Sequence, residues 1–291
     1  MQSKNIFSNV LLILFLLLFT HAGVNAQDAK PKKKHKVGAV YFSWGYNEEW
    51  YTTSTVHIQQ DALGNSYDLV QVKATDHKGW DDGIFNKALT IPQYNYRLGY
   101  YFNKKQDLGI ELNFDHTKYL IADGQTIQLN GKLANTPVSE SIVFSQANGF
   151  YYYLNNGANF FLFNFVRRLG LYSTKDNKFH LDLISKAGIG PVVPHVQNSL
   201  FGQANLPHFQ LGGWNIGQEN VLRATVMKYG FIEFSEKVDY ASYSHLAIYD
   251  GLAKQNFGTI EFILSIGFII PTTSHNPLFT AAPVIKDGGN E

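Results

Sequence analysis

The feature that most constrains this chain is a regular alternation of residue types over its segment 257–270. Because a β-strand points successive side chains to opposite faces, residues of one parity share a face. The apolar residues of one parity are Ile260, Phe262, Leu264, Ile266, Phe268 and Ile270, and the other parity holds Thr259, Glu261, Ser265 and Gly267. A continuously apolar face opposite a polar one is typical of a lipid-facing strand in an outer-membrane β-barrel.

The start of the chain carries an export signal. Residues 1–26 combine Lys4, an apolar run over 11–19 and small residues at 24–26, which is the pattern of a secretory signal peptide. The apolar run is too short to span a membrane as a helix, which needs about 20 residues. The chain has no cysteine, so neither a lipoprotein anchor nor a disulfide framework is expected.

Composition narrows the class further. Aromatic residues make up 15% of the chain and charged residues only 16%, with a formal net charge of +1. The aromatic content favours β-strands and membrane interfaces. The near-zero net charge argues against nucleic-acid binding, which usually needs a strongly basic domain. After the signal peptide we expect a basic periplasmic lead-in at 27–36, a barrel over 37–270 and a flexible periplasmic tail at 271–291.

The number of strands follows from the connection lengths. Short turns at 103–106 and 228–230 are expected on the periplasmic side, because bacterial barrels place long loops outside. The fold class predicted is therefore all-β, an antiparallel transmembrane β-barrel of eight strands with long extracellular loops. The expected strands are 37–47, 93–102, 107–119, 149–166, 178–190, 214–227, 231–240 and 256–270. The expected outer loops are 48–92, 120–148, 191–213 and 241–255, with 54–75 forming a projecting hairpin. A ten-strand count, which adds 54–59 or 66–75 to the wall and splits 149–172, is the alternative.

The inward-facing positions of these strands are rich in ionisable residues. The interior of an eight-strand barrel is only wide enough to be filled by side chains. We therefore expect a lumenal network of paired charges that plugs the barrel, because an unpaired buried charge is costly. A proton or ion path through a narrow channel is the alternative. The inward residues are Arg97, Glu111, Asp115, His180, Asp182, Lys186, Arg223, Glu233 and Glu261.

Motifs for cofactor chemistry are missing from the sequence. There is no glycine-rich phosphate loop, no zinc-ligand spacing and no Gly-x-Ser-x-Gly motif, so we expect neither a cofactor nor a metal. The weak catalytic candidates are Asp115, His116 and Thr117 at one strand end, and Ser244 and His245 in the last loop, as base, orienting acid and nucleophile. The simpler interpretation of His116 is a residue of the membrane rim that keeps its polar tip wet.

The first outer loop combines aromatic and acidic residues. Trp50, Tyr51, Trp80 and Phe85 are the candidate ligand-binding residues, beside Asp76, Asp81 and Asp82. Aromatic faces next to hydrogen-bonding acids suit a sugar or protein surface. The alternative is that these aromatics only pack the projecting hairpin. The expected partners are outer-membrane lipid and lipopolysaccharide, and an extracellular polysaccharide or protein.

Several stretches resemble one family of Gram-negative outer-membrane barrel proteins whose biochemistry is not settled. They are 41–47, 91–102, 115–119, 124–126, 188–195, 200–202 and 253–257. The chain is also similar in size to barrels of the OmpA, OmpW and lipid A deacylase type. The deacylases carry a His-x-Ser-Asn stretch, whereas this chain has Thr117, Lys118 and Tyr119 after His116. The resemblance implies a small outer-membrane barrel and no particular activity.

These observations together predict an integral protein of the outer membrane with a plugged lumen. We expect a non-enzymatic role, structural or surface-binding through the outer loops. An outer-leaflet hydrolase that modifies lipid A, or a narrow channel, are the alternatives.

Overall fold

The computed structural model describes residues 38–76, 93–103 and 105–272. All of them belong to one compact unit of the chain, Val37–Glu291. The expected signal peptide, the basic lead-in, Trp80, Phe85 and most of the C-terminal tail lie outside the described residues. No helix within the described ranges is long and apolar enough to cross a membrane.

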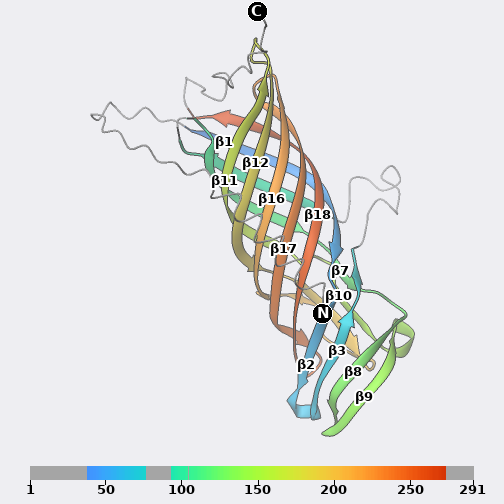
Figure 1. Ribbon diagram of the computed structural model, residues 1–291. Coiled ribbons are helices and arrows are strands. Elements are labelled where there is room, and N and C mark those ends of the chain that lie inside the picture. Colours follow the sequence, from blue (N-terminus) through green and yellow to red (C-terminus); the bar gives the residue numbers. More distant parts are fainter. Residues whose placement is uncertain (1–37, 77–92, 104, 273–291) are drawn as a thin grey trace, which may run out of the picture. The chain divides into compact units, whose positions relative to one another are not determined.

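Eight strands form a ring in which each strand pairs in antiparallel fashion with two neighbours (Figure 1). In chain order they are β1 (Ala39–Tyr51), β5 (Tyr94–Tyr101), β6 (Leu108–His116), β11 (Phe160–Ser173), β12 (Phe179–Val192), β16 (Gly213–Val226), β17 (Gly230–Ile248) and β18 (Gly251–Pro271). The last strand, β18, pairs with the first, β1, over the whole length of β1. The expected eight-strand fold is confirmed. The ten-strand alternative is wrong, because residues 54–75 lie outside the ring.

The alternation in the sequence explains the two faces of the ring wall. On β18, Leu264 is 58% exposed, whereas Glu261 is completely buried and Ser265 nearly so. The same contrast holds on β6, where Ile110 and Leu112 are exposed and Glu111 is buried. The strands therefore turn their apolar parity outward and most of their polar parity inward, which is the reverse of a water-soluble barrel.

Two expected boundaries are wrong. The strand expected over 149–166 is interrupted: only its part from Phe160 belongs to the ring, as β11, and Tyr151–Leu154 forms β10 in a separate sheet. Gly157 and Asn159 both have positive φ, so the chain changes direction between the two strands. Residues 241–255 were expected as an outer loop. They instead continue the β17–β18 hairpin, with a register shift between Tyr243 and Leu246.

Beyond the ring, the chain builds a second compact region at the end where β17 and β18 turn, which we call the head. Its first layer continues the main sheet: β2 pairs with β18, and β3, β8 and β9 follow in order. These strands are β2 (Ser54–Gln60), β3 (Asn65–Val72), β8 (Gln125–Leu133) and β9 (Thr136–Phe144). The hairpin expected at 54–75 is thus present as β2 and β3.

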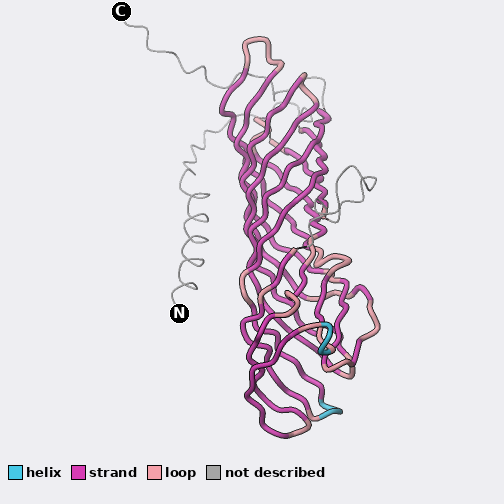
Figure 2. The backbone as a smooth tube through the Cα atoms, turned by 90° about the vertical axis from the view of Figure 1, so that its right-hand side faces the viewer, coloured by secondary structure: helices cyan, strands magenta, loops and turns pink. Residues whose placement is uncertain are grey.

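The second layer of the head is a smaller sheet in the order β14-β13-β10-β7-β4, with β15 paired to β13. Its strands are β4 (Ala74–Thr75), β7 (Tyr119–Ile121), β10 (Tyr151–Leu154), β13 (His195–Leu200), β14 (Gln203–Ala204) and β15 (His208–Phe209). Two short 3-10 turns, η1 (Asp61–Leu63) and η3 (Gln146–Asn148), also lie in the head (Figure 2). Much of what was expected as long loops is therefore ordered strand.

An apolar core fills the head. It includes Ile58 and Leu69 from the first layer, Tyr152 and Val196 from the second, and Phe257 from β18. A second, smaller apolar cluster lies inside the ring at the other end of the strands, around Tyr41, Tyr101 and Phe231. The charged part of the interior lies between these two apolar clusters.

Candidate functional site

The inward face of the ring strands changes character where the ring meets the head. On β18, the buried residues Thr259 and Glu261 are polar, and two residues further along the same face Phe257 is buried and apolar. The outward face changes in the opposite sense, from exposed Ile260 to exposed Asn256 and Lys254. An apolar exterior needs lipid and a polar exterior needs water, so the membrane boundary falls near Gly258. The apolar part of β18, from Ile260 to Ile270, spans roughly 25 Å after strand tilt, as a bilayer requires.

The charged interior is built by the register of five adjacent strands. Glu49 on β1 pairs with Glu261 on β18, and Glu261 pairs with Lys237 on β17. The same row continues through Glu219 on β16 to Lys186 on β12. Because all five residues have the inward parity, the row presents Glu, Glu, Lys, Glu and Lys side by side inside the ring.

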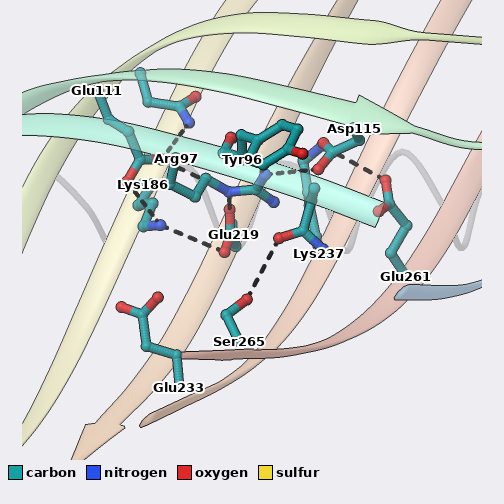
Figure 3. A network of polar contacts seen from close by, with 12 residues as sticks. Tyr96, Arg97, Glu111, Asp115, Lys186, Glu219, Glu233, Lys237, Glu261 and Ser265 are labelled. Carbon is teal, nitrogen blue, oxygen red and sulfur yellow. Dashed lines mark hydrogen bonds and ion pairs between the residues drawn. The ribbon is translucent and has the colours of Figure 1, made fainter. Parts of the chain in front are cut away.

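The opposite wall supplies the partners of this row, so the ion pairs cross the interior (Figure 3). Lys237 Nζ lies 2.5 Å from Asp115 Oδ2, and Lys186 Nζ lies 2.9 Å from Glu111 Oε2. Arg97 Nη1 lies 2.6 Å from Asp115 Oδ1, and Arg97 Nε lies 3.4 Å from Glu219 Oε2. Strands β6 and β17 are not neighbours in the sheet, so the Lys237–Asp115 pair ties distant parts of the wall together.

Carboxylates outnumber cations in this network. Lys237 also approaches Asp239 Oδ2 at 2.7 Å and Glu261 Oε1 at 3.5 Å, so one ammonium group serves three carboxyl groups. Glu49 is buried too, and the hydroxyl of Tyr51 donates to its Oε2 at 2.7 Å. Gly217 leaves room for Asp239, because a Cβ at position 217 would lie 1.8 Å from Asp239 Oδ1.

A second group of charges lies nearer the other end of the ring. Arg223 Nε donates to Glu233 Oε1 at 2.6 Å. The Arg223 guanidinium also lies 4.1 Å from the ring centroid of Phe231 and 4.5 Å from that of Tyr41. This arrangement combines an ion pair with cation–π contacts in a space without solvent. The aromatic rings and the guanidinium fill this end of the interior.

The nine residues expected in the lumen all lie inside the ring and are buried. Arg97, Glu111, Asp115, Lys186 and Glu261 belong to the central network, and Arg223 pairs with Glu233. Asp182 pairs instead with Arg168 at 3.0 Å, and His180 Nε2 lies 3.2 Å from the carbonyl oxygen of Asn177.

Sequence reasoning missed four members of the network. They are Glu49, Glu219, Lys237 and Asp239. Lys237 and Asp239 share the inward parity of Glu233, and Glu219 shares that of Arg223. All three lie within the expected strands 214–227 and 231–240, so parity alone would have found them. Glu49 was missed because the first strand was expected to end before it.

The weak catalytic candidates do not come together in the described part of the chain. Asp115 points into the ring and pairs with Arg97, whereas His116 has the outward parity and stacks on Tyr94 with ring centroids 4.6 Å apart. The hydroxyl of Thr117 is buried without a partner. Ser244 and His245 form the irregularity in β17, where Ser244 N–H donates to the carbonyl oxygen of Gly212 at 2.7 Å.

The candidate ligand-binding aromatics also separate. Trp50 points outward, is 47% exposed and packs edge-on against Phe262 at the membrane boundary. Tyr51 points inward, where its hydroxyl oxygen also lies 2.7 Å from the carbonyl oxygen of Lys118. Trp80 and Phe85 lie outside the described residues, as do Asp81 and Asp82. Asp76 accepts a hydrogen bond from the backbone N–H of Glu49 at 3.0 Å.

No group of three or more histidine, aspartate or glutamate side chains in the described ranges is arranged to hold a metal ion. The members of the network are buried and are joined to one another by ion pairs and hydrogen bonds.

No protein-family model matches this chain, and no curated protein matches it. Among solved structures, the chain is similar to Ail of Yersinia pestis in complex with the heparin analogue sucrose octasulfate. The identity is 15% and the TM-score is 0.30, and the match covers 80% of this chain and 99% of the Ail chain. It is also similar to the outer-membrane protein OprG of Pseudomonas aeruginosa, at 10% identity and a TM-score of 0.37 over 81% and 97%. A third similar structure is the outer-membrane protease OmpT of Escherichia coli, at 7% identity and a TM-score of 0.33 over 81% and 96%.

These likenesses concern the fold and carry no activity over to this chain. The membrane placement follows from the chain itself: an eight-strand antiparallel ring with an apolar exterior and a polar interior is the architecture of a small outer-membrane β-barrel. The expected fold is confirmed, and the protein lies in the outer membrane.

Proposed function

We propose that this outer-membrane protein is a plugged barrel that holds the ordered head outside the cell as a non-enzymatic surface for binding. The reversal of both faces of β18 near Gly258 is the observation that carries the proposal. The reversal separates the ring, whose outer face contacts lipid, from the head, whose outer face contacts water. The head consists of ordered strands on the water side of this reversal, and rigid scaffolds commonly carry recognition on such extensions.

Single cysteines test this topology, because the chain has none of its own. Lys132→Cys in the head should react with a membrane-impermeant maleimide on intact cells. Lys175→Cys, in the turn between β11 and β12, should react only after the outer membrane is permeabilised. Leu264→Cys, on the lipid face, should stay unlabelled in both cases. Labelling of Lys175→Cys but not of Lys132→Cys on intact cells would reverse the orientation.

The plugged lumen is the second part of the proposal. The central ion pairs and the cluster of Arg223 with Tyr41 and Phe231 occupy the interior at two levels. Planar-bilayer recordings of the pure protein should show no stable, large conductance steps, because an eight-strand interior leaves no room beside its side chains. Reproducible steps of nanosiemens size would contradict the plug and favour the channel alternative.

A surface for a polysaccharide or protein partner is supported by exposed apolar side chains in the head. Leu206, Phe209 and Leu211 are 85%, 57% and 72% exposed. Neighbouring exposed apolar residues of this kind often mark interaction sites. The purified protein should be retained on at least one of a panel of immobilised neutral and anionic polysaccharides, and a variant with all three residues changed to serine should not. Equal retention of the variant would place binding elsewhere.

A further inference from the structure

The lipid-facing wall is not apolar everywhere. At mid-height on three adjacent strands, the outward positions are Ser185 on β12, Asn220 on β16 and Glu236 on β17. The register places them in one row, since Ser185 pairs with Asn220 and Asn220 pairs with Glu236. Figure 1 shows these three strands side by side. Gln218 has the same parity on β16 but is only 9% exposed, and it joins this group, which we call the polar patch, through its hydrogen bond to Asn220.

Large apolar residues frame the polar patch on both sides, so it lies within the membrane rather than at its edge. On β12, β16 and β17, the apolar residues with outward parity are Leu183, Leu222 and Phe234 on the side away from the head. On the side toward the head they are Ile189, Ile216 and Tyr240. On β5 and β6 the outward face is apolar at the corresponding depth, where Leu98 and Leu112 pair with each other and are both 49% exposed.

The patch has more hydrogen-bonding capacity than the chain satisfies. Ser185 Oγ donates to Asn220 Oδ1 at 3.1 Å, and Gln218 Nε2 donates to the same oxygen at 2.9 Å. Glu236 is exposed and has no hydrogen-bond or ion-pair partner among the described residues. Lipid tails offer neither donors nor acceptors, so an ionisable side chain in this position is costly unless another protein surface meets it.

We propose that the polar patch is the interface through which two copies of this chain pair in the membrane. The patch carries a carboxyl acceptor in Glu236 beside an amide donor in Asn220. Under a two-fold axis the Glu236 of one copy meets the Asn220 amide of the other, and the reverse contact forms at the same time. The short side chains of Ser185 and its neighbour Ala187 let the two walls approach closely, as small residues do between membrane-embedded segments. This inference rests on the membrane placement of the ring and not on any binding role of the head.

Chemical cross-linking of full-length protein in native membranes tests the interface. Ala187→Cys leaves every polar group of the patch in place and lies one strand away from the proposed two-fold axis, so a membrane-permeant bismaleimide that bridges the two thiols should give a covalent dimer of the protein with itself. Leu112→Cys, exposed on the opposite wall, is the matched control and should give none. Adding Glu236→Leu to Ala187→Cys should lower the dimer yield roughly 3- to 15-fold, the range expected for hydrogen bonds between membrane segments.

The outcomes are decisive because folding is measured separately. Glu236→Leu makes the lipid face more apolar, so this variant should insert and keep its heat-modifiable band on a gel. Glu236→Gln serves as a second variant, because it keeps a polar group at the same position. The proposal is overturned if Ala187→Cys gives no dimer, if Leu112→Cys gives as much, or if the cross-linked partner is a different protein. Topology by maleimide labelling would be unaffected by any of these results.

Discussion

The interior of the ring and the interior of the head are built from the same faces of the same strands, yet they have opposite chemistry. On β17, Lys237 and Asp239 are buried in the ring, and Ala241 and Tyr243 follow on the same face in the head. The head is stabilised by apolar burial, in which contributions are many and non-directional. The ring interior depends on a few ion pairs, each of which fails if one partner is lost. The two regions should therefore respond differently to single substitutions.

The largest effect is expected for Lys237→Met. This change leaves Asp115, Asp239 and Glu261 without their shared cation in a space closed to water. Breaking such a buried pair typically costs about 3–5 kcal/mol. Urea unfolding in lipid vesicles measures the loss. Lys254→Met, on the exposed face of the head, is the control and should change stability by less than about 0.5 kcal/mol. Equal effects would remove the distinction between the two regions.

The membrane boundary is tested by placing the same charge on both sides of it. Leu264→Arg puts a cation on the lipid face of the ring and should cost roughly 2–4 kcal/mol. Asn256→Arg lies on the same face of β18 but beyond Gly258, where water solvates the charge, so it should be nearly neutral. Heat modifiability on gels and urea unfolding measure the stability of both variants. A folded, unperturbed Leu264→Arg protein would mean that the two faces have been assigned the wrong way round.

Two buried tyrosines sharpen the comparison within the head. Tyr243 donates its hydroxyl to the carbonyl oxygen of Ala158 at 2.9 Å, whereas the hydroxyl of Tyr152 is buried without a partner. Burial also holds the pKa of Tyr152 well above its ordinary value, because an ionised ring would be poorly solvated there. Tyr243→Phe should cost about 1–3 kcal/mol and Tyr152→Phe about nothing. Limited proteolysis of the head gives the readout, and the opposite order would contradict the assignment.

Among the charged residues inside the ring, the smallest effect is expected for Glu261→Gln. Glu261 faces another carboxyl group, Glu49, and lies 3.5 Å from Lys237, which has two other carboxylate partners. A neutral side chain keeps the hydrogen bond from Asn47 and relieves the excess of negative charge. Stability in urea should change by no more than about 1 kcal/mol. Glu219→Gln is the informative comparison, because Glu219 contacts both Arg97 and Lys186 and its loss should cost more.

The sequence predicted the ring well and the head poorly. Strands that face lipid on one side show a period of two over many residues, so β5, β6, β12, β16 and the ring part of β18 were identified close to their bounds. The strands that belong only to the head are short, and the ring strands become irregular where they enter it. β17 contains a register shift at Ser244 and His245, and β10 and β11 are separated by residues with positive φ. Such features break the period, and a sequence pattern then indicates a loop.

The candidate sites divide in the same way. Parity alone indicated which charged residues point inward, but not that Lys237 would meet Asp115 across the ring. The separation of Asp115 from His116, and of Trp50 from Tyr51, follows from the alternation of side chains along a strand. For Asp115 and His116, parity already predicted one residue inside the ring and the other at the membrane rim.

The sequence by itself determined the class of protein, because the alternation of apolar and polar residues fixes which solvent each face of a strand can meet. It also determined that the interior would be charged. Only the tertiary structure decided which charges pair, since ion pairs across the ring join strands far apart in the chain and depend on register and closure. It also decided that the outer segments fold into a head with its own core. That core needs two sheets to bury their apolar faces against each other, and no single segment carries that information.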